Sequence, residues 1–243
     1  MSHIEKVKQQ AIEVKILYDA YLETLSDNER LEFRAAFHLR PTSCGKTTIV
    51  STLQCAPMRG LPNCTLTKIK EKLPELQNVV LESESKQLTI LEKAKFKFKN
   101  KGFREENAQA AFIRNVIQNK FDDMIFVASE FDLFEFGEKK EIKRPDVFSY
   151  RNGVLYDIEL KNERTTATVE QSARYVAHLK KNLSEYSDCL YEYPSFKITE
   201  IRDVKGIALV PDSEESIGTL ELASKKLDVD LWFFNQLFNV RKT

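Results

Sequence analysis

Hydrophobic residues recur at steps of three and four over residues 4–25. This spacing places them on one face of an amphipathic helix. A second helix is predicted from the Ser26 cap to about Leu39, because Pro41 disfavours helical backbone in the residue before it.

Shorter elements are predicted next. Helices are expected over residues 46–56 and from the Thr65 cap through Leu73, and two apolar runs joined by a polar turn predict a β-hairpin over 78–91. Helices followed by a hairpin are the order of a winged helix, whose third helix would enter a DNA groove. That helix carries Lys68, Lys70 and Lys72. The alternative is a helical packing or dimerisation domain with solvated lysines.

Lysine alternates with mostly apolar residues over residues 93–101. Alternate residues of a strand share a face, so these lysines would form one strip. The strip either contacts nucleic-acid phosphates or protects a strand edge from pairing with other chains. Its members are Lys93, Lys95, Lys97, Lys99 and Lys101. The segment joins two predicted domains, a mainly helical DNA-recognition domain over residues 1–92 and an α/β domain over residues 93–243.

A second hairpin is predicted around Asn152-Gly153, a dipeptide typical of two-residue type I′ turns. Taking these two residues as the loop places Asp146 directly opposite Glu159. Two such carboxylates have Cβ atoms about 4.5–5.5 Å apart, and they destabilise a sheet unless something neutralises them. Mg²⁺ or Mn²⁺ would do so, because hard cations take carboxylate, water and phosphate oxygens.

Period two places Asp157 and Lys161 on the same face as Glu159. Lys161 would orient an attacking water and offset the negative charge that grows on a reacting phosphate. The predicted chemistry is metal-assisted hydrolysis of a phosphodiester. The alternative is that these residues form the solvated face of a two-layer sheet.

The Pro-Asp pair at 145–146, followed across the hairpin by Glu-Leu-Lys at 159–161, resembles the motif of the PD-(D/E)XK nuclease superfamily, which includes many restriction endonucleases. The order strand, strand, helix, strand, helix, strand within residues 104–235 is similar to the family core. The resemblance implies a restriction-endonuclease-like mixed sheet flanked by helices, preceded by the mainly helical N-terminal domain.

The resemblance also implies a role for each residue of the motif. Asp146 and Glu159 would bind the metal, which is Mg²⁺ with Mn²⁺ as a substitute. The backbone carbonyl of Leu160 would add a ligand, and Lys161 would be the catalytic lysine.

Residues on two helices are implicated in the same way. Many family members place an acid on the helix before the core strands, and either Glu105 or Glu106 fits that position. Gln171 and Tyr175 are spaced QxxxY as in the RecB-like branch and lie one helical turn apart. They would steady the site or contact the scissile strand. The family pattern assigns no role to Asp157.

The predicted function is a Mg²⁺-dependent DNA endonuclease, most similar to a type II restriction enzyme or a related defence nuclease. A homodimer is expected by analogy, because cleavage of a duplex needs two active sites. One alternative is a repair or recombination nuclease that selects a DNA structure. Another is a DNA-binding regulator whose nuclease-like core does not cut.

Composition agrees with these expectations and excludes other classes. The 243 residues include 37 Lys+Arg and 37 Asp+Glu, so the net charge is zero. Residues 1–100 carry 16 basic and 12 acidic residues, whereas residues 101–243 carry 21 basic and 25 acidic residues. The chain has no long apolar stretch and no signal-peptide core, so we expect a cytoplasmic protein with no membrane partner. The segment at 43–48 resembles a phosphate-binding loop, but Arg40 stands where the spacing requires Gly, so no nucleotide cofactor is expected.

Overall fold

The computed structural model describes much of the C-terminal part of the chain and a shorter N-terminal part. The described residues are 3–41, 47–51, 71, 73–74, 105–117, 121, 123–131, 133–136, 141–190, 200–212, 217–235 and 240–243. The hairpin predicted over 78–91, the lysine strip at 93–101 and most of the helix predicted to end at Leu73 lie outside this set. The DNA contacts expected of Lys68, Lys70, Lys72, Lys95, Lys97 and Lys99 therefore stay predictions.

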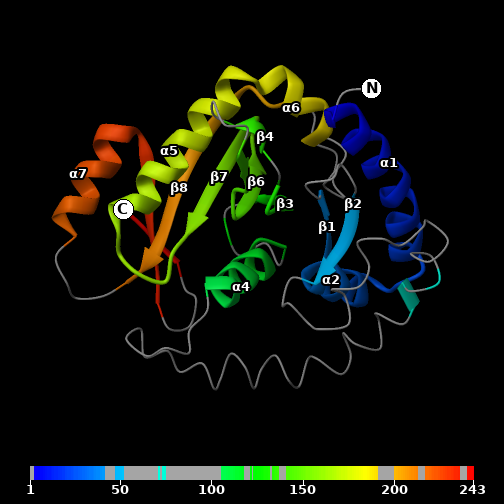
Figure 1. The fold of residues 1–243 in the computed structure, drawn as a ribbon. Helices are drawn as coiled ribbons and strands as arrows, with labels where there is room; N and C mark the ends of the chain where they lie inside the picture. The colour runs from blue at the N-terminus through cyan, green and yellow to red at the C-terminus, as the bar shows by residue number, and fades with distance from the viewer. Residues whose placement is uncertain are drawn as a thin grey trace.

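A six-stranded mixed sheet forms the centre of the protein (Figure 1). Its strands lie in the order β10-β9-β8-β7-β6-β3. Strands β7, β8 and β9 are parallel, whereas β3–β6, β6–β7 and β9–β10 are antiparallel pairs. The strands are β3 (Ile125–Ser129), β6 (Val147–Arg151), β7 (Val154–Leu160), β8 (Asp203–Pro211), β9 (Val229–Phe234) and β10 (Val240–Lys242). The predicted α/β class and mixed sheet are confirmed.

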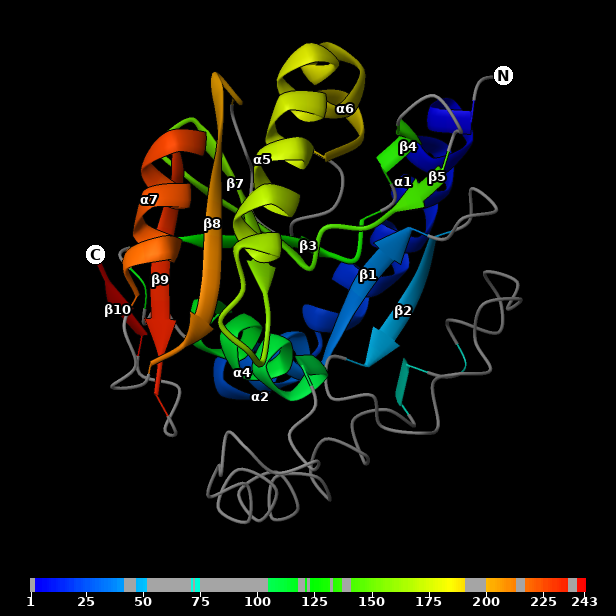
Figure 2. The ribbon, with the colours of Figure 1, turned by 60° about the vertical axis from the view of Figure 1, so that its left-hand side comes forward.

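Helices cover both faces of this sheet (Figure 2). Helix α4 (Glu105–Ile117) packs on one face, and α5 (Thr166–Lys181) and α7 (Gly218–Leu227) pack on the other. Helix α6 (Leu183–Leu190) follows α5. No helix in the described part of the chain combines the length and the apolar character needed to cross a membrane.

Alternation along the central strands explains this layering. In β8, Ile207 and Leu209 pack towards α4, whereas Ala208 and Val210 pack towards α5 and α7. Both faces of the strand are therefore buried, and residues 206–211 form a continuous apolar run. Each fully buried aliphatic side chain of this kind stabilises the fold by about 1.5–3 kcal/mol.

The described N-terminal part consists of α1 (His3–Leu22), α2 (Asp27–Ala36), β1 (Phe37–Pro41) and β2 (Thr47–Ser51). The predicted cap at Ser26 is confirmed. Its backbone N–H donates to the Glu29 carboxylate at 3.0 Å, which is one half of a capping box.

Two of the N-terminal predictions are wrong. The second helix ends at Ala36 rather than near Leu39. Residues 47–51, which were predicted to be part of a helix, form β2, which pairs antiparallel with β1. The run Thr-Thr-Ile-Val at 47–50 consists of β-branched residues, which lose side-chain freedom in a helix and suit a paired strand. The winged-helix order therefore loses one of its helices.

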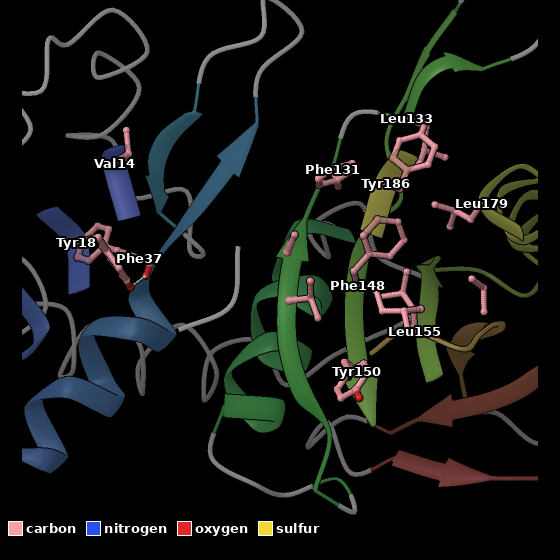
Figure 3. Packing of buried hydrophobic residues seen from close by; sticks show 14 of the residues in the cluster. Val14, Tyr18, Phe37, Phe131, Leu133, Phe148, Tyr150, Leu155, Leu179 and Tyr186 are labelled. Atoms are coloured by element: carbon pink, nitrogen blue, oxygen red, sulfur yellow. Dashed lines mark hydrogen bonds between the residues drawn. The ribbon is translucent and has the colours of Figure 1, made fainter. Parts of the chain in front are cut away.

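An aromatic cluster fixes the end of α2 (Figure 3). Phe33 packs between Tyr18 and Phe37, and the Tyr18 hydroxyl donates a hydrogen bond to the Phe37 carbonyl. The same buried cluster continues through Phe148 and Tyr186, so the N-terminal helices share a core with the sheet. Beside it, β4 (Leu133–Phe136) and β5 (Glu141–Lys143) form a two-stranded sheet.

Candidate active site

The β6–β7 hairpin has the register predicted from its turn. Arg151 pairs with Val154, and the ladder extends to Val147 opposite Ile158. Asn152 and Gly153 have φ angles of 51° and 84°, as a type I′ turn requires. One further step along this register places Asp146 opposite Glu159.

Asp146 and Glu159 are linked by hydrogen bonds across the end of the hairpin. The backbone N–H of Asp146 donates to Oε1 of Glu159 at 3.2 Å, and the backbone N–H of Leu160 donates to Oδ2 of Asp146 at 2.8 Å. Each acid is therefore tied to the strand that carries the other. Neither carboxylate can rotate away without breaking a bond to the main chain.

The two faces of β7 differ as predicted. Tyr156, Ile158 and Leu160 belong to the apolar cluster beneath α4. Asp157 and Glu159 point to the opposite face, where both contact α5, and both are fully buried. The polar face of β7 is thus not a solvated surface, since Asp157 and Glu159 lie under helix α5.

Helix α5 brings the predicted QxxxY pair to Glu159. The helix begins at a Thr165 cap, whose side chain accepts from the Ala167 N–H. The side-chain amide of Gln171 donates to Oε2 of Glu159 at 2.6 Å and to the Tyr175 hydroxyl at 3.1 Å. Both oxygens of Glu159 therefore accept hydrogen bonds, one from the Asp146 backbone and one from Gln171 of α5.

Lys161 follows the end of β7 and forms an ion pair with Glu105, the first residue of α4. This contact places Glu105 at the site, while the side chain of Glu106 lies outside the described part of the structure. Gln109, one turn further along α4, donates to the backbone carbonyl of Asp146 at 2.6 Å. Gln109 was not among the predicted site residues, although its i, i+4 spacing from Glu105 places both on one helix face.

A second contact between β7 and α5 was also missed. The hydroxyl of Ser172 donates to Oδ2 of Asp157 at 2.6 Å, and both residues are fully buried. Period two indicated that Asp157 shares the face of Glu159, but a partner on a helix 15 residues away leaves no local signal.

Burial raises the pKa of all three carboxyl groups. The pKa of Asp146 rises to about 7, because burial outweighs the Leu160 N–H and the Lys161 charge, which lower it. The pKa of Glu159 is raised by burial and then by Asp146 and Asp157, and that of Asp157 is raised by burial despite the Ser172 hydrogen bond. Protonation relieves the repulsion among these acids, and a bound cation would do the same.

The pKa of Lys161 is also raised, and for a lysine this favours the charged form. Burial by itself lowers the pKa of its ammonium group, but the hydrogen bond to Glu105 and the charges of Asp146 and Glu159 raise the pKa above its usual value. Lys161 is therefore a stable cation beside two acids at neutral pH.

The donor set fits a hard divalent cation. Asp146 and Glu159 offer carboxylate oxygens, and in the described structure no group donates a hydrogen bond to Oδ1 of Asp146. No described cluster of three or more His, Cys, Asp or Glu side chains is arranged to enclose a metal. Two carboxylates with water and substrate oxygens are the usual shell of Mg²⁺.

The chain matches no protein-family model, and comparisons with curated proteins and with solved structures found no match. What this site does is therefore inferred from its residues and their geometry.

Proposed function

We propose that the protein is a Mg²⁺-dependent DNA endonuclease whose active site is of the PD-(D/E)XK type. One observation carries the proposal. Asp146 and Glu159 are interlocked across the β6–β7 hairpin, with Lys161 at the end of the same strand. This arrangement places two carboxylate metal ligands beside one ammonium group, and metal-assisted phosphodiester hydrolysis uses both kinds of group.

Asp146 and Glu159 would hold the metal, together with the Leu160 carbonyl. A bound Mg²⁺ supplies Lewis-acid stabilisation of the phosphate and lowers the pKa of water. The residues of the chain prepare the site. The Leu160 N–H keeps the Asp146 carboxylate across the hairpin, and Gln171 keeps the carboxylate of Glu159 from turning. Such preorganisation means that little reorganisation is needed during the reaction.

Lys161 would act on the reacting phosphate. Its ammonium group is half-buried and is held by Glu105, so the positive charge has a defined position. A fixed cation next to the phosphate offsets the charge that grows in the transition state, and it can orient the attacking water.

The test is cleavage by the pure protein with Mg²⁺. Supercoiled plasmid, single-stranded DNA and RNA would each be incubated with and without chelator. We expect chelator, Asp146→Ala and Lys161→Ala each to abolish cleavage of DNA. Asp230→Ala and Lys205→Ala are matched controls, because both side chains are exposed and lie on β9 and β8, outside the hairpin that carries Asp146 and Glu159. Undiminished cutting by Glu159→Ala in Mg²⁺ would refute the assigned mechanism.

A second candidate is a repair or recombination nuclease that selects DNA structure. The direct bond between Gln171 and Glu159 favours it, because the QxxxY pair is typical of the RecB-like branch. Discrete plasmid fragments would support a restriction-type enzyme, whereas a smear, or cutting confined to flaps and single strands, would support this second candidate. Tight DNA binding without metal-dependent cleavage of any substrate would instead indicate a regulator.

The proposal extends to partners. The lysines of residues 68–72 and 93–101 would contact DNA phosphates, and a homodimer would supply two active sites to a duplex. Light scattering of the protein with and without a short duplex would measure the mass. A monomer that makes only single-strand nicks would contradict the dimer.

A further inference from the structure

A buried carboxyl group lies next to the proposed active site but takes no part in it. Asp157 is fully buried on β7, two residues before Glu159 on the same face of the sheet. Its Oδ2 accepts a 2.6 Å hydrogen bond from Ser172 of α5. Its Oδ1 is buried and has no hydrogen-bond partner in the described structure.

A glycine allows this contact to form. Gly206 of β8 is the ladder partner of Asp157, and Ser172 lies over the pair. A Cβ atom on Gly206 would come within 2.5 Å of the Ser172 hydroxyl and 3.2 Å of a methyl group of Val176. Helix α5 therefore approaches the sheet more closely here than any other residue at position 206 would permit.

The close approach determines where Gln171 lies. Gln171 and Ser172 are consecutive on α5, and they bond to Glu159 and Asp157, which are alternate residues of β7. Two adjacent residues of a helix thus contact two carboxylates on one face of a strand. A helix displaced along or away from the sheet at Ser172 would carry the Gln171 amide away from Glu159.

Stability alone does not account for Asp157. Burying a carboxyl group with one oxygen unpaired destabilises the fold, whereas an apolar side chain buried at the same position would stabilise it. Leu155, two residues earlier on this face, is such a fully buried apolar residue. A costly buried polar contact beside a candidate site indicates a requirement for geometry.

We propose that Asp157, Ser172 and Gly206 form a seat for α5 that positions Gln171 against Glu159. These three are positioning residues, since they act through Gln171 and do not touch substrate. The effect on catalysis rests on the proposed nuclease function, but the placement of Gln171 does not, so the two can be tested separately.

The first test reads the position of Gln171 directly. Its side-chain amide signals in a ¹H–¹⁵N spectrum would be assigned by their loss in Gln171→Met. We expect these signals to move towards those of solvent-exposed glutamines in Ser172→Ala and in Gly206→Ala. Ser224→Ala is the matched control. Ser224 is also a helix serine, on α7, and its hydroxyl donates a 2.6 Å hydrogen bond to the Val229 carbonyl of β9. Gln171 signals that stay in place in Ser172→Ala would overturn the seat, whatever the activity.

The second test measures DNA cleavage in Mg²⁺. Loss of an outer partner of a metal ligand typically costs 10–100-fold, so we expect Ser172→Ala to lower kcat about tenfold with little change in KM. Asp157→Asn keeps an oxygen that accepts from Ser172, so it should lose less activity than Asp157→Leu. In Gly206→Ala the added methyl group collides with the Ser172 hydroxyl. Removing that hydroxyl relieves the collision, so the kcat of the double variant Gly206→Ala/Ser172→Ala should rise from that of Gly206→Ala towards that of Ser172→Ala. A change in KM alone would contradict positioning of a catalytic group.

The two tests separate failure of the seat from failure of the nuclease proposal. If the wild-type protein cleaves no substrate but the Gln171 signals move in Ser172→Ala, the nuclease proposal fails and the seat stands. If the wild-type protein cleaves DNA, and the Gln171 signals and kcat are unchanged in Ser172→Ala and Gly206→Ala, the proposed seat is refuted and the nuclease proposal stands. Thermal unfolding of each variant identifies any that is not folded, and Ser172→Ala removes only one hydroxyl.

Discussion

Oδ2 of Asp146 accepts a 2.8 Å hydrogen bond from the backbone N–H of Leu160, on the neighbouring strand. Asp146 precedes β6, and Leu160 ends β7, so the bond closes the open end of the hairpin. It holds the Asp146 carboxylate at the end of the strand that carries Glu159. The pairing of these two acids therefore depends on the hairpin register.

The stability of the metal-free protein should fall as pH rises from about 4 to about 7. Burial raises the pKa of Asp146 from 3.8 to about 7, and the pKa values of Asp157 and Glu159 move in the same direction. In this window the folded state binds more protons than the unfolded state, so the free energy of unfolding decreases with pH. Each kcal/mol lost lowers Tm by roughly 2–4 °C in a chain of this size.

Thermal unfolding in chelator at several pH values measures this effect. Asp146→Asn removes one of the titrating groups, so its Tm should depend less on pH than that of the wild type. Added Mg²⁺ should raise the wild-type Tm most at the alkaline end, because the cation competes with protons for the same carboxylates. Equal pH dependence in Asp146→Asn and wild type would contradict the raised pKa of Asp146.

Glu105→Gln should lower the cleavage rate about tenfold, the size expected for an outer partner of a metal site. The change removes the negative partner that holds the Lys161 ammonium group and raises its pKa. Lys161 would lose both its fixed position and part of its protonation at high pH, so the loss should grow above pH 8 in a pH–rate profile. Glu106→Gln is the comparison, and a larger loss there would transfer the role to Glu106.

Tyr175→Phe should lower kcat by roughly 2–10-fold, as expected for one hydrogen bond of about 0.5–1.5 kcal/mol. The Tyr175 hydroxyl accepts from the Gln171 amide at 3.1 Å, and that amide also holds Glu159. Steady-state kinetics would show the effect in kcat rather than in KM. Tyr150→Phe is the matched control, because the Tyr150 hydroxyl bonds to the Glu200 carbonyl, and an equal loss there would count against a specific role.

Gly153→Ala should destabilise the protein by about 1–2 kcal/mol. Gly153 has a φ angle of 84°, and an added Cβ would also come within 2.5 Å of the Arg202 side chain. Urea unfolding measures the loss. Asn152→Gly should change stability by only a few tenths of a kcal/mol, since glycine adopts the observed φ of 51° readily. An unaltered unfolding midpoint in Gly153→Ala would show that the turn does not hold the register.

Local patterns in the sequence were sufficient to predict the hairpin and the placement of its acidic side chains. The Asn152-Gly153 turn and the two-residue period of β7 together determine which side chains stand opposite and which share a face. Helix α5, with Gln171 and Tyr175 one turn apart, was likewise predictable from spacing of three and four. These features depend on residues that are close in the chain, so the sequence alone determined them.

Only the tertiary structure decided the features that depend on distant residues. Phe37–Pro41 forms a strand because it pairs with β2, although the first of these residues continue a helical pattern. Glu105 reaches Lys161 across 56 residues, and Ser172 reaches Asp157 because Gly206 lets α5 approach the sheet. Sheet order and helix packing bring these pairs together, and no spacing along the chain encodes such a contact. The candidate acids could be read from the sequence, whereas the contacts that hold them in place required the fold.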